Sequence, residues 1–128
     1  MEKKKEFRIT LPNEPGQLAR VCEALVDCGV NILSVAAIGA VNPVVALVAD
    51  QEDKTRDALE EMNLSFQEME LLTVELPHRP GELGAFTKKM GDANINIDSI
   101  YLLWESSGEV KVALTVSDLT KAKQELGL

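Results

Sequence analysis

The sequence predicts an α+β fold built from two similar modules in tandem. The first observation is an internal repeat, because a shift of 65 residues aligns the range 11–35 with the range 76–100 without a gap. The second is that apolar residues follow a strand-like and then a helix-like period, in the same order in both copies. Self-similarity at a fixed period is typical of repeated structural units. We therefore expect one module at residues 1–70 and a second at residues 71–128.

Module 1 shows its elements in a readable order. Phe7, Ile9 and Leu11 alternate with other residues, which predicts a strand. The next segment is a helix with Pro15 in its first turn, where the missing N–H costs little, and Gly29 stops it. The expected strands of module 1 are Glu6–Leu11, Asn31–Val41, Val44–Ala49 and Ser65–Met69, and its helices are Pro15–Cys28 and Asp53–Met62.

Module 2 repeats this order but ends one strand early. Its longer hairpin is expected to turn at Ser107-Gly108, and Asp118 or Ser117 is the expected N-cap of its second helix. The expected strands are Leu71–Leu76, Ile97–Glu105 and Val110–Val116, and the helices are Pro80–Ala93 and Asp118–Leu126.

The first helices of the two modules carry the same apolar stripe. The matched positions follow an i, i+3, i+7, i+10 pattern, which is one side of an amphipathic helix. They are Leu18, Val21, Leu25 and Cys28 in module 1, and Leu83, Phe86, Met90 and Ala93 in module 2.

The β-α-β-β-α-β order is that of the ferredoxin-like split βαβ unit, in which both helices cover one face of an antiparallel sheet. Module 2 lacks the fourth strand, which in this fold lies beside the first. The strand Leu71–Leu76 then becomes a bare edge, and bare edges invite pairing with another chain. We expect another strand to cover this edge, either from within the chain or from a second chain.

Two short motifs recur at the same spacing in both modules. Module 1 reads Asn13-Glu14-Pro15-Gly16-Gln17-Leu18, then a helix, then Gly29-Val30-Asn31-Ile32. Module 2 reads His78-Arg79-Pro80-Gly81-Glu82-Leu83, then a helix, then Asn94-Ile95-Asn96-Ile97. This pattern resembles the ACT domain, a small ligand-binding module attached to many enzymes of amino-acid metabolism. The resemblance covers nearly the whole chain and implies two ACT modules in tandem.

The turn before each first helix has the chemistry of a carboxylate site. Free backbone N–H groups point outward at the positive end of the helix. Gly16 lets a ligand approach the backbone closely, and Asn13 adds an amide at the same place. Asn31 lies beyond the other end of the helix, so both loops can hold one ligand only across a two-fold or pseudo-two-fold contact between modules.

The ACT resemblance implies the same arrangement. In that family amino-acid effectors sit at interfaces between paired modules, and in ACT domains that bind serine the positions matching Asn13 and Asn31 supply the amide ligands. The candidate ligand-binding residues are therefore Asn13, Glu14, Pro15, Gly16, Gln17, Leu18, Asn31 and Ile32 in module 1, and His78, Arg79, Gly81, Glu82, Leu83, Asn96 and Ile97 in module 2.

Each candidate also has a purely structural interpretation. In this interpretation the pair Pro15-Gly16 starts a helix and has no other role, and Asn31 simply accepts the left-handed or turn geometry after Gly29. In module 2, His78 and Arg79 stand where module 1 has Asn13 and Glu14. They either pair with a carboxylate or form a solvated turn.

Further side chains in this sequence are better explained by packing than by ligand binding. Tyr101 and Trp104, on the second hairpin strand of module 2, are of the kind that usually packs. Cys22 and Cys28 do not have a redox or zinc spacing and are best explained as small buried apolar residues.

The composition and the chemistry-bearing residues exclude several classes of function. The net charge of −8 argues against a nucleic-acid partner, because phosphate binding requires clustered Lys and Arg. His78 is the single histidine and has no ligand-spaced partner, so no metal site or cofactor is predicted. No nucleophile has a base in a recognisable spacing, and we therefore expect a protein that is not an enzyme.

No targeting or membrane segment is expected. The amino terminus is charged and has no apolar signal-peptide core. The range Cys28–Ala49 has no charged residue and is long enough to span a bilayer, but its polar residues, its glycines and Asn42-Pro43 favour two strands joined by a turn. We expect a cytoplasmic protein without a membrane partner.

Three functional hypotheses follow. The first is a non-catalytic sensor, expected to be a homodimer, that binds a free amino acid between paired ACT modules and regulates amino-acid metabolism, with a metabolic enzyme as an additional expected partner. The second is a regulatory subunit of a biosynthetic enzyme. The string NEPGQLARV resembles the start of the small subunit of acetolactate synthase, although that subunit does not carry a second ACT copy in this form. The third is a structural dimerisation module with a vestigial site.

Overall fold

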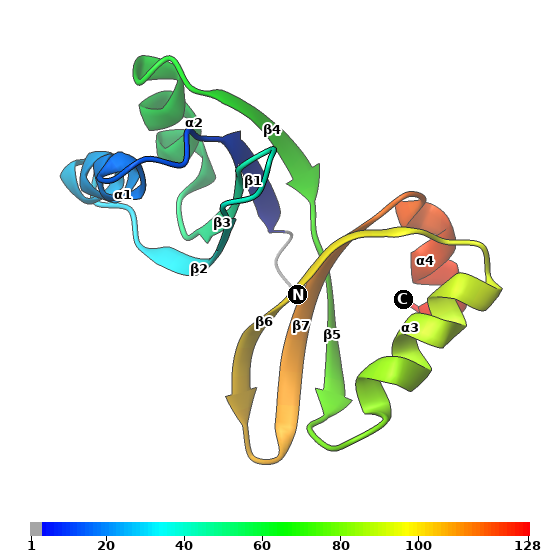
Figure 1. Ribbon diagram of the computed structural model, residues 1–128. Helices are drawn as coiled ribbons and strands as arrows, with labels where there is room; N and C mark the ends of the chain where they lie inside the picture. The colour runs from blue at the N-terminus through cyan, green and yellow to red at the C-terminus, as the bar shows by residue number, and fades with distance from the viewer. Residues whose placement is uncertain (1–3) are drawn as a thin grey trace. The chain divides into compact units, whose positions relative to one another are not determined.

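A computed structural model of the protein describes residues 4–128. The chain divides into two units, Met1–Glu70 (unit 1) and Leu71–Leu128 (unit 2). Figure 1 shows unit 1 in blue to green and unit 2 in green to red. Each unit has its own sheet, its own pair of helices and its own apolar core.

Unit 1 has the β-α-β-β-α-β order that the sequence predicts. Its elements are β1 (Lys5–Thr10), α1 (Gln17–Asp27), β2 (Ile32–Ile38), β3 (Val44–Ala49), α2 (Glu52–Glu61) and β4 (Ser65–Glu70). The four strands form an antiparallel sheet in the order β2-β3-β1-β4. Both helices cover the same face of this sheet, because Leu25 of α1 and Leu59 of α2 are fully buried in one core with Phe7 of β1.

Unit 2 has the order β-α-β-β-α. Its elements are β5 (Leu72–Pro77), α3 (Glu82–Asp92), β6 (Ile97–Ser106), β7 (Glu109–Val116) and α4 (Leu119–Leu126). The three strands form an antiparallel sheet in the order β5-β7-β6. Met90 of α3 and Ala122 of α4 are fully buried with Leu114 of β7, and Figure 1 shows both helices on the same side of the sheet.

The predicted fold class is confirmed, with two ferredoxin-like antiparallel sheets of which the second has one strand fewer. In unit 1, β4 pairs with β1 from Lys5 to Thr10. Among residues 4–128, no strand pairs with the corresponding edge of β5. The covering strand is therefore not supplied by the described part of the chain, and pairing of this edge with a second chain stays a prediction.

The Pro-Gly pair of each copy forms a turn that precedes the helix. The N–H of Gln17 donates to the carbonyl of Glu14 at 3.3 Å, and Gly16 has φ +84°. Glu14 to Gln17 therefore form a type II turn. Pro15 supplies the φ that the second position of this turn needs, and the third position, Gly16, requires a positive φ. The predicted helix start at Pro15 is wrong, because the left-handed backbone of Gly16 cannot be part of α1. Unit 2 repeats this geometry at Gly81, where φ is +91°.

The helices end in a left-handed residue that reverses the chain. After α1, Gly29 has φ +72°, and the N–H of Val30 donates to the carbonyl of Leu25 at 2.9 Å. This is a Schellman motif, and it confirms Gly29 as the stop. In unit 2 the same position is taken by Asn94 with φ +59°. Asn31 does not have positive φ, so the interpretation of Asn31 as the left-handed residue is wrong.

The two hairpins differ at their turns. β2 ends at Ile38, three residues before the predicted end, and a five-residue loop runs from Gly39 to Pro43. A longer β2 hairpin is disfavoured because Pro43 has no N–H to donate across the strands. In unit 2, Ser107 and Gly108 both have positive φ and form the predicted two-residue turn, with the geometry that matches the strand twist.

The uncharged stretch that begins at Cys28 folds as the hairpin of unit 1. Its residues form β2, the following loop and β3. Within the range that the structure describes, no helix is both long enough and apolar enough to cross a bilayer.

An ion pair joins α2 to β4. The Nε of Arg56 donates to Oε2 of Glu68, and its Nη2 donates to Oε1, each at 2.6 Å. These bonds from Arg56 hold the pKa of the Glu68 carboxyl below its ordinary value, and Lys5 Nζ at 3.5 Å acts in the same direction. The pair fastens the second helix to the edge strand of the sheet.

The left-handed residue after α1 gives the first prediction. We expect Gly29→Ala to lower the free energy of unfolding by about 1–2 kcal/mol, since an L side chain is strained at φ +72°. Gly84 lies in α3 with open space around it, so we expect Gly84→Ala to raise this free energy by up to about 1 kcal/mol. Urea unfolding of both variants measures these two opposite changes in the free energy of unfolding. A Gly29→Ala protein as stable as wild type would contradict the left-handed conformation of Gly29.

The lowered pKa of Glu68 gives a pH dependence. A carboxyl with a lowered folded pKa stabilises the fold above its ordinary pKa of about 4.3, and this contribution is lost as the pH falls through the folded value. We expect Glu68→Gln to lower the free energy of unfolding at pH 7 by about 0.2–1 kcal/mol, with a smaller difference from wild type in acid. Urea unfolding from pH 7 to 3 measures this, with the exposed Glu61→Gln as the control. A difference that does not change with pH contradicts the prediction.

Candidate functional site

Unit 1 has a pocket where the β1–α1 loop meets the end of the hairpin. Its volume is about 190 Å³. The loop and α1 contribute Leu11, Pro12, Asn13, Glu14, Gln17 and Leu18, and the hairpin contributes Ala37, Ile38, Gly39, Pro43, Val44 and Val45. The structure thus brings four of the candidate residues of module 1 to one place.

The side-chain amide of Asn13 lies against Gly39 at the mouth of this pocket. A Cβ at Gly39 would stand only 2.6 Å from Nδ2 of Asn13 and 2.9 Å from its Cγ, so only glycine leaves room for the amide there. Within residues 4–128, the Asn13 amide forms no hydrogen bond. Its donors and its acceptor are therefore available to a ligand.

The start of α1 lies beside the same amide. Gly16 is the N-cap and no side chain caps the helix, so the first N–H groups after the turn keep their hydrogen-bonding capacity. The N–H of Gln17 is already used by the carbonyl of Glu14, and that of Arg20 by the carbonyl of Gly16. The N–H groups of Leu18 and Ala19 have no backbone acceptor in the described part of the chain. Pro15 and Gly16 shape the turn that exposes them.

Asn31 and Ile32 lie at the opposite end of α1 and do not line the pocket. The backbone of Asn31 is held by Asp50, whose Oδ1 accepts from the Asn31 N–H at 2.9 Å and whose N–H donates to the Asn31 carbonyl at 3.1 Å. The Asn31 side chain is exposed and has no hydrogen-bond partner among the described residues. The eleven residues of α1 rise by about 16 Å, which separates this amide from Asn13.

Unit 2 has a pocket in the same topological place, with a volume of about 450 Å³. It is formed by the β5–α3 loop and by β6 and β7. The lining residues are Leu76, Pro77, His78, Arg79, Pro80, Gly81, Leu83, Leu102, Val110 and Val112. His78, Arg79, Gly81 and Leu83 are candidates from the sequence, and the first of these is tied down by its N–H, which donates to the carbonyl of Gly108 at 2.8 Å.

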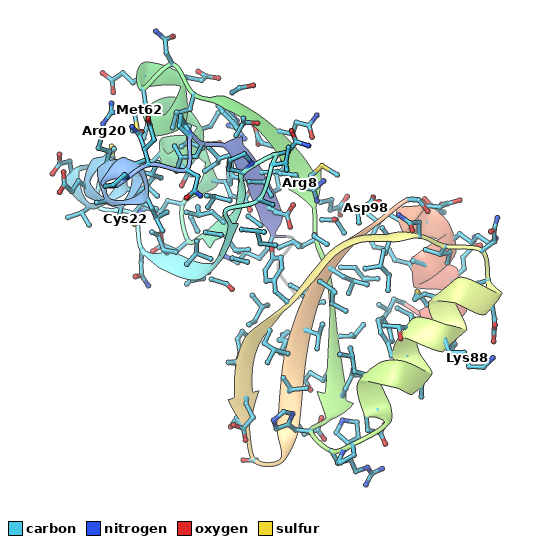
Figure 2. All side chains as sticks on the ribbon, viewed as in Figure 1. Arg8, Arg20, Cys22, Met62, Lys88 and Asp98 are labelled. Atoms are coloured by element: carbon cyan, nitrogen blue, oxygen red, sulfur yellow. The ribbon has the colours of Figure 1, made fainter. Side chains whose placement is uncertain are left out.

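The remaining candidates of unit 2 differ from their counterparts in unit 1. Nδ2 of Asn96 donates to Oδ1 of Asp98 at 2.7 Å, and the Asp98 side chain lies near the start of β6 (Figure 2). The side-chain amide of Asn96 is therefore bonded to Asp98, whereas the amide of Asn31, its counterpart in unit 1, has no partner among the described residues. Glu82 pairs with Arg79, whose Nε donates to Oε1 at 2.9 Å. Neither Asn96, Ile97 nor Glu82 lines the pocket.

Sequence reasoning missed the hairpin side of both pockets. Ala37 lines the first pocket and Leu102 the second, and these two positions are 65 residues apart, as the repeat requires. The first residue of each apolar stripe also marks the pocket. Leu18 and Leu83 begin the stripes, but they are 38% and 49% exposed. The stripe is buried at its second and third residues and half-buried at its fourth, and its first residue borders the pocket.

Each unit also leaves one hairpin strand open at the edge of its sheet. Within residues 4–128, β2 pairs only with β3, and β6 pairs only with β7. Apolar side chains are exposed on these strands and on the adjacent helices, namely Leu18, Val26, Leu33, Val35 and Ile38 in unit 1, and Leu83, Ile100, Leu102 and Trp104 in unit 2. An open strand flanked by apolar side chains is a template for pairing.

Other chemistry-bearing residues do not gather into a site. No group of three His, Cys, Asp or Glu in the described range is placed to hold a metal ion. Cys22 and Cys28 are half-buried free thiols, and Cys28 packs against the core of unit 1. Trp104 is half-exposed, and Nζ of Lys111 lies over its ring, 4.7 Å from the ring centroid.

The contact between Asn13 and Gly39 gives a prediction for the site. We expect Gly39→Ala to displace the Asn13 side chain, because the added Cβ would overlap it at 2.6 Å. The side-chain NH₂ signals of Asn13 in an NMR spectrum should shift, while the fold stays intact. Val41→Ala, at a fully exposed position of the same loop, is the control and should leave these signals in place. Unchanged Asn13 signals in Gly39→Ala would show that the amide lies elsewhere.

Comparisons with known proteins support the fold. No family model matches the chain, and no curated protein matches it in sequence. The solved structures that are similar in fold include three with 19% identity or less. Protein BT0572 from Bacteroides thetaiotaomicron has a TM-score of 0.84 at 19% identity, with 98% of this chain and 87% of that chain covered.

Two further solved structures of similar fold are, by their names, subunits of aspartate kinase. The regulatory subunit of aspartate kinase from Thermus flavus has a TM-score of 0.68 at 16% identity, covering 99% of this chain and 92% of that one. A structure of aspartokinase alpha and beta subunits has a TM-score of 0.69 at 15% identity, covering 96% and 89%. In fold, the chain is a tandem pair of ferredoxin-like modules, and it shares this fold with these solved structures.

Proposed function

We propose that the protein is a non-catalytic sensor that binds a free amino acid between paired ACT modules and regulates an enzyme of amino-acid metabolism. The observation that carries this proposal is the unbonded Asn13 amide, which lies beside the uncapped start of α1 at the mouth of a small pocket. Asn13 is exposed, and its amide donors and acceptor have no partner among the described residues, so they are open to a ligand that enters from solvent.

The groups around this pocket match the two charges of an amino acid. The backbone N–H groups at the start of α1 and Nδ2 of Asn13 are donors for a carboxylate. Glu14, also in the lining, is a counter-charge for an ammonium group. The volume of about 190 Å³ limits the ligand to a few non-hydrogen atoms, so we expect affinities between micromolar and millimolar.

Pairing of two copies through β2 completes the site. The pocket lies at the end of β2, at Ala37, Ile38 and Gly39, while Asn31 precedes its start. In an antiparallel pair of β2 strands related by a two-fold axis, the start of one strand lies opposite the end of the other. Asn31 of the second copy would then lie beside Asn13 of the first, with a ligand between them.

This arrangement supplies a mechanism for regulation. A ligand that contacts both copies binds the paired state more tightly than the separate state, and so it shifts the equilibrium toward the pair. The exposed apolar residues of β2 and α1 provide the surface that pairing would cover. A cytoplasmic homodimer that transmits ligand occupancy to a metabolic enzyme is the form we propose.

The named fold neighbours support a regulatory partner. Two of them are a regulatory subunit of aspartate kinase and an aspartokinase subunit assembly, and this chain spans most of the length of each. We therefore propose that the enzyme partner, like aspartate kinase, acts in amino-acid metabolism. The chain itself would contribute no catalytic group.

The proposal predicts stabilisation by one or a few free amino acids. At a concentration about a hundred times the dissociation constant, a ligand adds roughly 2.7 kcal/mol, which corresponds to a rise in Tm on the order of 5–10 °C. A thermal-shift screen of the free amino acids measures this. The rise should disappear in Asn13→Ala and in Asn31→Ala, while Asn96→Ala, whose amide is already bonded to Asp98, should keep it. A screen without any shift would favour a purely structural module.

Mixing the two variants tests whether the site is shared between copies. Asn13→Ala and Asn31→Ala proteins should each fail to bind alone, but a mixed pair has one intact site. With random exchange, about a quarter of the wild-type binding capacity should return, since half of the pairs are mixed and each has one intact site of two. Isothermal titration after mixing measures this, and no recovery would show that the two amides do not act across copies.

A further inference from the structure

The two pockets differ in the charge that they present at the same position. Glu14 lines the pocket of unit 1, and the residue 65 positions later, Arg79, lines the pocket of unit 2. Likewise, His78 stands where unit 1 has Asn13. The unit 2 pocket has no Asp or Glu among the residues that line it. An ammonium group placed there would meet the guanidinium of Arg79, and the neighbouring carboxylate of Glu82 is outside the lining and already paired with Arg79.

The guanidinium of Arg79 is oriented but not saturated. Its Nε donates to Oε1 of Glu82 on α3 at 2.9 Å, and the Arg79 side chain is 69% exposed. Its two terminal nitrogens have no hydrogen-bond acceptor in the range 4–128. A guanidinium offers these terminal N–H groups as a fork that matches the two oxygens of a carboxylate.

The rest of the pocket is apolar and larger than that of unit 1. Its walls are Leu76, Val110 and Val112 from the strands, with Leu83 and Leu102 at the opening. The last two are 49% and 55% exposed, so a ligand would cover apolar surface that now faces water. Where unit 1 has Ala37, unit 2 has Leu102, and the volume of about 450 Å³ is in the range of small-molecule sites.

We propose that the unit 2 pocket binds a small apolar monocarboxylate without an α-ammonium group, such as a branched aliphatic acid or its 2-oxo derivative. Arg79 binds the carboxylate, and the leucine and valine side chains enclose the aliphatic body. The protein then has two unlike sites, one for an amino acid in unit 1 and one for an ammonium-free acid in unit 2. This goes beyond the proposed sensor function and does not depend on it.

The test is an NMR titration of the full chain with three molecules of one shape. These are 4-methylpentanoate, leucine, which has the same aliphatic body with an added ammonium, and 4-methylpentan-1-ol, which has no charge. We expect 4-methylpentanoate to shift the backbone signals of Leu76, Gly81 and Leu83 with a dissociation constant on the order of millimolar or below. Leucine and the alcohol should bind there at least about tenfold more weakly.

Two variants test whether the guanidinium of Arg79 is the group that recognises the carboxylate. Arg79→Gln should weaken 4-methylpentanoate at this pocket about tenfold while the alcohol is unaffected, because only the carboxylate loses its partner. Arg20→Gln is the matched control, since Arg20 (Figure 2) lies on α1 of unit 1 and, among residues 4–128, its guanidinium donates only to Gln17. It should leave the titration unchanged.

Three results overturn the proposal. They are the absence of any shift at the unit 2 pocket, binding of leucine as tight as that of 4-methylpentanoate, and an Arg79→Gln variant that binds the acid as well as wild type. None of them bears on amino-acid binding in unit 1, which is followed at the signals of Asn13 and Asn31. Failure of either site is therefore distinguishable from failure of the other.

Discussion

The length of the first helix in each unit is the constraint on which the proposed function depends. In unit 1, α1 must cross the sheet from the end of β1 to the start of β2, and its eleven residues separate the Asn13 loop from Asn31. The turn at Gly16 and the reversal at Gly29 fix both ends of this helix. A single unit can therefore present two halves of a polar site but cannot close them on one ligand. In the proposed function a second copy closes the site, and the open edge of β2 is where we propose that it pairs.

The order of the elements was predictable because local rules and long-range packing agree. The apolar periods, the stop at Gly29 and the turn at Ser107-Gly108 each depend on a few neighbouring residues, and the structure keeps all three. The predicted start of α1 was wrong because Pro fits both the first turn of a helix and a type II turn. Only the backbone angle at Gly16 distinguishes these two roles, and that angle is not visible in the residue types.

The candidate site was less predictable, since it depends on contacts between distant residues. The sequence indicated Asn13 and Asn31, but not that Gly39 makes room for the first amide or that Asp50 holds the backbone of the second. Equivalent residues also turned out to be unequal. Asn96 matches Asn31 in the repeat, yet Asp98 takes up its amide, whereas unit 1 has Leu33 at the matching position. Two copies of one backbone thus offer different surfaces, and the repeat alone does not distinguish them.

The uncovered strand edges have a consequence for how the protein behaves in bulk solution. In the described range, β2, β4, β5 and β6 each leave one side without a strand partner, and β2 and β6 carry exposed apolar residues. Molecules with several such edges can add to one another in open-ended series, and mutual repulsion of like charges opposes this. The formal charge of −8 supplies that repulsion near neutrality, and it vanishes near pH 4.6, the isoelectric point. Acidification toward that pH removes this protection, and we expect the turbidity of a solution of the protein to rise there.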